Sequence, residues 1–271
     1  MAKEKTKTKK NKVYVTLGNK GGTGKTNTAI HILPAIIKQQ EPNAIIDFIE
    51  IDDNNKNSDV YTLSRVMNTM QSIQLKDGID MLQDVVFDLM EMREHHYIII
   101  DAGGGNDTKE VVSLIKTLEI TEVAELIYIV PFMSSKAQIQ NIRDMHSAKL
   151  FDKERVVYVL NSVKDMLNVE NEFLFWFGNN DLNIPSLYEE LEQPQCLHIP
   201  YTNLFDIATI GAETIYDYSE NARNFSAIEY NKFVMESGTL SRAELKKHST
   251  IYQKSKAMKD YINNYLQIKE L

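Results

Sequence analysis

Apolar runs and amphipathic segments alternate along the chain. Nearly continuous apolar runs are typical of parallel strands that are covered on both faces. We expect such strands at residues 13–17, 44–51, 97–100, 126–132 and 155–160. Between them, apolar residues recur at helical spacing, as at Leu82, Val85 and Leu89. Strands that alternate with helices predict an α/β fold, with a doubly wound, mainly parallel sheet and helices on both faces.

Two stretches have less regular patterns. Residues 58–96 predict a helix or loop, a turn at 76–78 and a helix over about 79–94. Pro34 lies within the helix that follows the first strand, where we expect it to kink or shorten that helix because proline lacks a backbone donor.

The first strand breaks at Gly18 into a glycine-rich loop that leads into a helix. Successive backbone N–H groups and the positive end of the helix dipole converge there, which predicts a phosphate-binding site. Lys25 is expected to reach the β- and γ-phosphates, and the Thr26 hydroxyl to ligate Mg²⁺. The residues expected to bind the nucleotide in this loop are Gly21, Gly22, Thr23, Gly24, Lys25, Thr26 and Asn27.

A second lysine, Lys20, stands on the other side of these glycines. The stretch Lys20-Gly-Gly-Thr-Gly-Lys25-Thr26 resembles the deviant Walker A loop of the ParA/MinD ATPases, although the strict P-loop pattern has glycine where this chain has Asn19. The resemblance implies a P-loop NTPase that forms a homodimer around ATP, with Lys20 and Lys25 as catalytic cations and Lys20 acting across the interface.

Acidic residues end two of the expected strands. Asp101 follows an apolar strand about 75 residues after the loop, as in a Walker B motif, and is expected to hold Mg²⁺ with Thr26. After the second strand, the resemblance implies a switch carboxylate that orients the attacking water and belongs to the metal site together with Thr26 and Asp101. Asp52 matches best by position, with Glu50 and Asp53 as alternatives, because the family often has Asp-x-Asp-Pro here.

Further matches to this family lie later in the chain. Asn161, at the end of a strand, is implied as a base-recognition residue, and Pro200 and Tyr201 as neighbours of the adenine. The resemblance covers most of residues 13–217. Without it, each of these residues is an ordinary turn or strand-end residue.

The remaining segments set the domain limits. Residues 1–12 are lysine-rich and predict a disordered basic tail, followed by one ATPase domain over 13–271. Within that domain we expect an aromatic-rich insertion at about 165–195, which forms either a small core or an exposed partner surface. A basic helical element is expected at about 240–271.

The net charge, the cysteine count and the lack of long apolar stretches argue against several classes of protein. The net charge of −8 argues against a protein that coats nucleic acid with its whole surface, although local basic patches can still bind it. The single cysteine, Cys196, excludes an internal disulfide and suits a reducing cytoplasm. No apolar stretch suggests a signal peptide or a membrane span, so a cytoplasmic location is expected.

The resemblance implies a weak ATPase that is stimulated by a partner and acts as a dimerising switch in plasmid or chromosome partition. Its expected partners are a second copy of the chain, nonspecific DNA and a site-specific adaptor protein. The alternatives are a MinD-like ATPase that cycles on a membrane, which is the less favoured surface, and a metabolic P-loop enzyme of the same fold.

Overall fold

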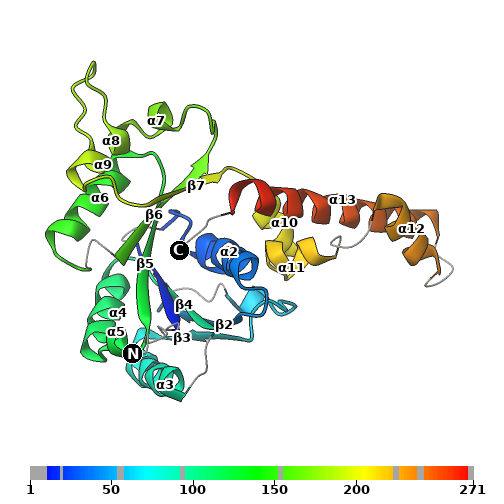
Figure 1. The fold of residues 1–271 in the computed structure, drawn as a ribbon, viewed down its shortest axis with the longest axis horizontal. Coiled ribbons are helices and arrows are strands. Elements are labelled where there is room, and N and C mark those ends of the chain that lie inside the picture. Colours follow the sequence, from blue (N-terminus) through cyan, green and yellow to red (C-terminus); the bar gives the residue numbers. More distant parts are fainter. Residues whose placement is uncertain are drawn as a thin grey trace, which may run out of the picture.

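The computed structural model describes residues 11–18, 21–53, 58–91, 95–151, 155–221, 226–236 and 241–267. Its centre is one sheet of seven strands in the order β3-β2-β4-β1-β5-β6-β7, and all the pairings are parallel (Figure 1). The strands are β1 Lys12–Thr16, β2 Ile45–Ile51, β3 Thr69–Ile73, β4 His96–Ala102, β5 Glu125–Phe132, β6 Val156–Val163 and β7 Cys196–Pro200. The doubly wound α/β fold predicted from the sequence is confirmed.

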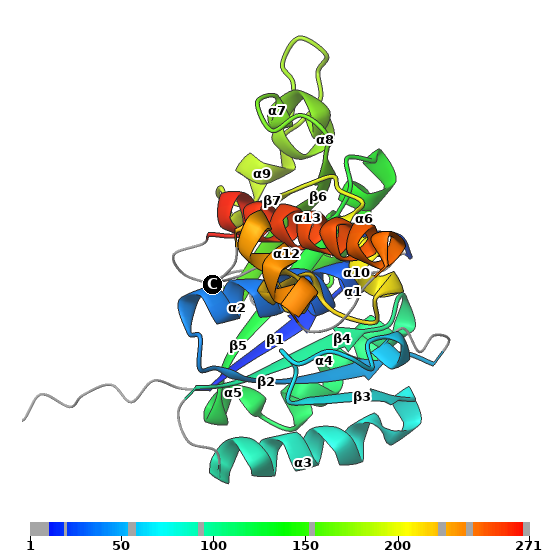
Figure 2. The same cartoon turned by 90° about the vertical axis from the view of Figure 1, so that its right-hand side faces the viewer.

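Helices cover both faces of the sheet (Figures 1 and 2). The first face carries α3 Gly78–Glu91, α4 Asn106–Thr117, α5 Ile120–Val123, α6 Lys136–Ser147, α7 Val169–Glu172, α8 Leu174–Phe177 and α9 Leu187–Glu190. The opposite face carries α1 Lys25–Asn27, the π-helical turn η1 Thr28–Ile32, α2 Leu33–Gln40, α10 Leu204–Ile210, α11 Ile215–Glu220 and α13 Arg242–Tyr265. Two short 3-10 turns, η2 Ser58–Val60 and η3 Leu75–Asp77, flank β3, and α12 Ala227–Glu236 packs on α13.

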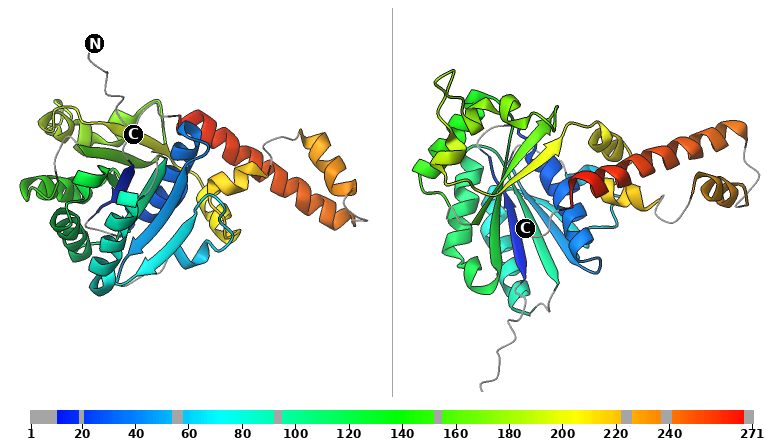
Figure 3. Two further views of the ribbon diagram at one scale, coloured as in Figure 1. Left: turned by 60° about the horizontal axis from the view of Figure 1, so that its bottom comes forward. Right: turned by 45° about the horizontal axis from the view of Figure 1, so that its top comes forward.

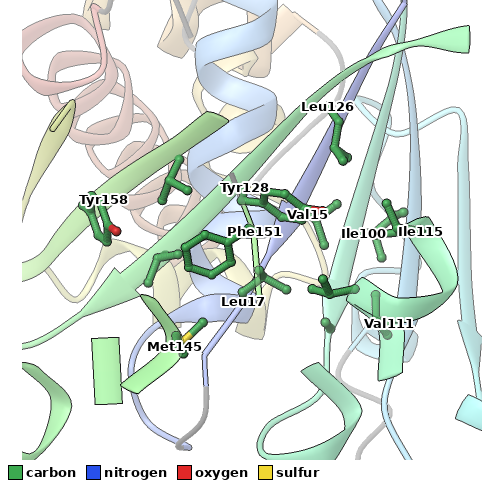
Figure 4. Packing of buried hydrophobic residues seen from close by; sticks show 14 of the residues in the cluster. Val15, Leu17, Ile100, Val111, Ile115, Leu126, Tyr128, Met145, Phe151 and Tyr158 are labelled. Atoms are coloured by element: carbon green, nitrogen blue, oxygen red, sulfur yellow. The ribbon is translucent and has the colours of Figure 1, made fainter. Parts of the chain in front are cut away.

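Alternate residues of each strand supply the two cores. In β1, Val13 and Val15 belong to the core under α3–α6, whereas Tyr14 belongs to the core under η1 and α2. Figure 4 shows the first of these cores, where Val15, Ile100 and Tyr128 of three neighbouring strands pack together with helix residues. Because both faces of the sheet are covered, the sequences of the inner strands are mostly apolar.

Two sequence predictions need correction. The 58–96 stretch contains a strand, β3, in addition to the predicted helix, because Thr69–Ile73 pairs in parallel with β2 at the edge of the sheet. The predicted basic tail ends earlier than residue 12. Lys12 belongs to β1, where it pairs with Tyr97 and Glu125 and its ammonium lies 3.9 Å from the Glu125 carboxylate. Residues 1–10 lie outside the described residues.

The helix after the loop does not stop at Pro34. It runs from Lys25 to Gln40 through η1, a turn in which the Leu33 N–H bonds Thr28 O instead of Ala29 O. Pro34 directly follows this turn and has no N–H with which to continue the i→i−4 hydrogen bonds. The wider turn therefore accommodates the proline and places His31 in the buried interior.

The aromatic segment joins the main core. Phe173 and Trp176 are fully buried, and the Trp176 ring lies 4.8 Å from that of Phe132 and 4.9 Å from that of Tyr158. Both partners come from the first-face core, so these rings extend it beyond β6 instead of forming a separate small core.

The C-terminal helix has two different halves. Near its end, Met258, Tyr261 and Ile262 are buried in the core under α2. Its beginning extends away from the sheet beside α12, where Tyr230 and Tyr252 pack at 5.1 Å (Figure 3). We refer to α12 with the first half of α13, residues 226–236 and 241–253, as the arm. Within the described residues, no helix combines the length and the apolar character needed to cross a membrane.

Candidate nucleotide site

The glycine loop lies at the carboxyl edge of the sheet, between β1 and α1. Gly22 and Gly24 have φ values of +74° and +93°, which favour glycine because other residues carry a Cβ. A Cβ on Gly24 would also meet the Asn161 Nδ2 at 2.0 Å. The loop therefore depends on glycine at this position for two separate reasons.

Asp101, at the tip of β4, is the central carboxylate of the site. It is 3% exposed and accepts hydrogen bonds from the Thr16 hydroxyl and, at 2.8 Å, from the Thr26 hydroxyl. The pKa of Asp101 is raised to about 6, chiefly by burial and to a smaller extent by the nearby Glu50. The two hydroxyls and Lys25 act in the opposite direction. Asp101 is consequently an anion at neutral pH. The hydroxyl groups that now donate to it stabilise its negative charge, as a bound cation would.

β2 and the residues that follow it bring three more carboxylates to this edge. Glu50 pairs in register with Asp101, is 1% exposed and accepts hydrogen bonds from Ser58 N at 3.0 Å and Ser58 Oγ at 2.8 Å. Asp52, two residues further, lines the pocket beside the loop. Asp53 accepts a hydrogen bond from Leu75 N at 2.7 Å. Of the three candidate switch carboxylates, only Asp52 therefore lines the pocket.

These elements enclose a pocket of about 450 Å³. The residues around it are Gly21, Gly22, Thr23, Gly24, Lys25, Thr26, Asn27, Asp52, Asp101, Ala102, Gly103, Met133, Asn161 and Ser162. The Lys25 side chain runs back over Gly18, and its Nζ lies 3.9 Å from the position that a Cβ on Gly104 would take. The Lys25 ammonium is thus held between the loop and the glycines after β4.

The pocket fits an anionic ligand. Thr23 is 4% exposed, and within the described part of the chain its hydroxyl has no hydrogen-bond partner. A buried hydroxyl without a partner costs free energy that a phosphate oxygen would recover. Nucleotide binding is therefore compatible with both the shape and the polarity of the loop.

The structure brings together most of the residues predicted from the sequence. Gly21 to Asn27, Asp52, Asp101 and Asn161 all line the pocket, whereas Pro200 and Tyr201 do not. Pro200 is buried and accepts a hydrogen bond from the Tyr261 hydroxyl at 3.0 Å, and Tyr201 is 68% exposed. Lys20 lies outside the described residues.

Several further residues of the site were missed in the sequence, Met133 among them. Thr16 bonds Asp101, Ser162 lines the pocket, and the Thr108 hydroxyl lies 2.7 Å from Gly103 O and 3.3 Å from Gly18 O. The pairing of β1 with β4 places Thr16 beside Asp101, and no short motif records that register. A threonine one turn into α4 could have been suspected only from its position after the glycines.

The donor set around Asp101 suits Mg²⁺. This ion prefers oxygen ligands, and usually takes one or two from the protein with the others from phosphate and water. The Thr26 hydroxyl and the Asp101 carboxylate offer such a pair. No group of three or more His, Cys, Asp or Glu side chains suited to a metal occurs among the residues that the structure describes.

No protein-family model matches the sequence, and no curated protein matches it either. Among solved structures, the chain is similar to a plasmid partition protein of Borrelia burgdorferi B31 bound to AMPPNP. The TM-score is 0.45 and the identity 14%, over 91% of this chain and 98% of the other. A likeness of this size does not bear on function, and the nucleotide site is inferred from the loop, Asp101 and the pocket that they line.

Proposed function

We propose that this chain is a Mg²⁺-dependent ATPase of the partition type, a switch that dimerises with ATP, hydrolyses it slowly and positions DNA. The observation that carries the proposal is the pair formed by Thr26 and Asp101, 2.8 Å apart, in the same pocket as Lys25. A hydroxyl, a carboxylate and a lysine at the mouth of a glycine loop are the groups that a triphosphate with its metal requires.

Each residue has a distinct part in the proposed reaction. The N–H groups of the loop and the Lys25 ammonium hold the phosphates, while Thr26 and Asp101 hold Mg²⁺, which when bound neutralises phosphate charge. Asp52 orients the attacking water. Glu50 is less suited to that role because Ser58 already donates two hydrogen bonds to its carboxylate.

Titration calorimetry with ATP and Mg²⁺ tests the site. Lys25→Ala and Thr26→Ala should each weaken binding at least tenfold, the free-energy equivalent of about 1.4 kcal/mol. Lys116→Ala is the matched control, because Lys116 is an exposed lysine in the last turn of α4, the end of that helix away from the pocket. Equal binding by all four proteins, or none by the wild type, would overturn the proposal.

The dimer rests on the sequence resemblance alone. Analytical ultracentrifugation should show an ATP-dependent dimer for the wild type and a monomer for Lys20→Ala that still binds ATP. A wild type that binds ATP and stays monomeric would reject the dimer but not the nucleotide site.

The arm and the rest of α13 supply a candidate DNA surface. Their basic side chains outnumber the acidic ones, in a chain whose net charge is −8. The basic residues are Lys232, Arg242, Lys246, Lys247, Lys254, Lys256 and Lys259, against Glu229, Glu236, Glu244 and Asp260. Exposed lysines and arginines on one projecting element favour sequence-independent contact with phosphates.

A gel shift with arbitrary duplex DNA tests this surface. We expect ATP-dependent binding that weakens with salt and is lost in the double variant Lys246→Glu with Lys247→Glu. The same protein should still bind ATP. A membrane role is less favoured, because the apolar end of α13 is buried in the domain, and ATP-dependent binding to anionic vesicles without DNA binding would reverse that preference.

A further inference from the structure

The β6 strand contains a bulge beside the nucleotide pocket. Asn161 pairs with Ile199 and Val163 pairs with Pro200, so one extra residue, Ser162, lies between them. Ser162 has a φ of +60°, a left-handed value that costs free energy in a non-glycine residue. Along β6, Val157 and Val159 face the core under η1 and α2, so regular alternation turns Asn161 to the same face, where the loop leads into α1. The bulge follows Asn161. It brings Ser162 to the pocket as well and returns Val163 to the opposite core.

The Asn161 amide contacts the loop backbone. Its Nδ2 donates to Thr23 O at 3.0 Å. A carbonyl oxygen only accepts hydrogen bonds, so the NH₂ end of the amide must face the loop. The same NH₂ group fills the space into which a Cβ on Gly24 would project. Asn161 and the loop are thus fitted to each other.

Two glycines flank the residue that Asn161 contacts in the loop. Thr23 stands between Gly22 and Gly24, both with positive φ, and glycine loses more conformational entropy on ordering than any other residue. A hydrogen bond to the middle residue restricts both flanking glycines at once. That restriction is present before any ligand binds, which lowers the cost of phosphate binding.

We propose that Asn161 is a positioning residue that holds the Thr23–Gly24 peptide in its phosphate-binding conformation. By holding that peptide, Asn161 sets the affinity for the phosphate chain of a nucleotide, whichever base the nucleotide carries. This role replaces the adenine recognition that the family resemblance implies for Asn161. The inference rests on the proposed function.

Calorimetry with three ligands separates the two roles. ATP, GTP and inorganic tripolyphosphate, each with Mg²⁺, are titrated into the wild type, Asn161→Ala and Asn161→Asp. Asn263→Ala, an exposed asparagine on α13, serves as the control. We expect Asn161→Ala to lose about fivefold to tenfold in affinity for all three ligands alike, the effect of one hydrogen bond.

The aspartate variant checks the same point while keeping the shape of the side chain. It removes the donor and adds a negative charge near the phosphates, so the loss should be larger for every ligand, with an unchanged ratio of ATP to GTP affinity. A loss confined to ATP, a changed ratio, or unaltered binding of all three ligands would overturn the inference.

Hydrogen exchange of the protein without nucleotide supplies an independent readout. Amides of residues 22–26 should exchange faster in both Asn161 variants at an unchanged melting temperature, because base recognition plays no part in that state. Unchanged exchange in a variant that folds would also overturn the inference. If the wild type binds none of the three ligands, the proposed function fails, and the exchange experiment still decides whether Asn161 holds the loop.

Discussion

His31, in the π-helical turn behind the loop, has a proton arrangement fixed by its neighbours. Ile215 N–H donates to Nδ1 at 3.2 Å, so Nδ1 must be the unprotonated nitrogen and Nε2 carries the proton. The Nε2–H then faces the Tyr61 hydroxyl at 3.1 Å. Because the Thr209 hydroxyl donates to Phe205 O at 2.8 Å, the Tyr61 hydroxyl donates to Thr209 Oγ1 at 2.9 Å. Every proton in this buried series of hydrogen bonds is therefore assigned.

Protonating His31 should destabilise the protein. A second proton would point Nδ1–H at the Ile215 N–H, and burial alone lowers the His31 pKa from 6.5 to about 3. Between these two pH values His31 is protonated in the unfolded chain and neutral in the folded chain. The free energy of unfolding therefore falls as pH drops from about 6.5 toward 3. Urea unfolding at pH 7 and pH 5 should show a loss of about 2 kcal/mol from this residue.

His31→Gln keeps an acceptor and a donor but does not titrate. It should be less stable than the wild type at pH 7 and should lack this part of the pH dependence. An identical loss between pH 7 and pH 5 in both proteins would contradict the assignment.

The sequence predicts individual site residues where a local motif exists. Lys25, Thr26 and Asp101 stand at strand-to-loop junctions that short patterns reveal, and they meet in the structure as expected. Thr16 and Ser162, which no motif marks, depend on strand register and on a bulge, which are properties of two strands together. A single sequence does not record them.

Between elements, one buried carboxylate connects the segment after β2 to α11. Asp217 is 2% exposed and accepts hydrogen bonds from Val66 N at 2.8 Å, Arg65 N at 3.0 Å and Ser64 Oγ at 2.9 Å. Its own helix adds a capping box, in which the Thr214 hydroxyl donates at 2.8 Å. The segment 64–66 is thus held by a helix about 150 residues later in the chain.

Asp217→Asn should lower the free energy of unfolding by about 2 to 4 kcal/mol, because an amide cannot accept all of these bonds and leaves buried donors without partners. Chemical denaturation measures the change. Glu213→Gln is the control, since its contact with the largely exposed Arg65 at 3.4 Å should contribute less than about 1 kcal/mol. Equal losses in the two variants would refute the assigned role of Asp217.

The elements that the sequence misjudges are those whose burial is unusual. β3 is an edge strand without a single fully buried residue, so its pattern lacks the apolar run that identifies the inner strands. The aromatic segment has the opposite character. Phe173, between α7 and α8, and Trp176, in α8, are buried in a core that strands distant in the sequence also form.

Across the whole molecule, α13 links the domain to the arm, and its two ends should respond differently to mutation. Met258 is fully buried, so Met258→Ala should cost about 2 to 4 kcal/mol of domain stability. Leu245→Ala alters only the small cluster that Leu245 forms with Tyr230, Val234 and Tyr252. We expect that variant to loosen the arm while leaving the main melting transition within about 1 kcal/mol of the wild type.

Calorimetric melting together with hydrogen exchange of residues 242–252 measures both effects. If Leu245→Ala lowered the main transition as much as Met258→Ala, the arm would have to unfold together with the domain.

The position of β1 in the middle of the sheet affects how the chain folds during its synthesis. Its partners in the sheet are β4 and β5, and Thr16 meets Asp101 only after 85 further residues have been added. At ordinary ribosomal speeds that takes roughly 4 to 17 seconds. During this interval the apolar first strand emerges without either neighbour, so nascent chains that end before residue 96 should depend on chaperones to remain unaggregated.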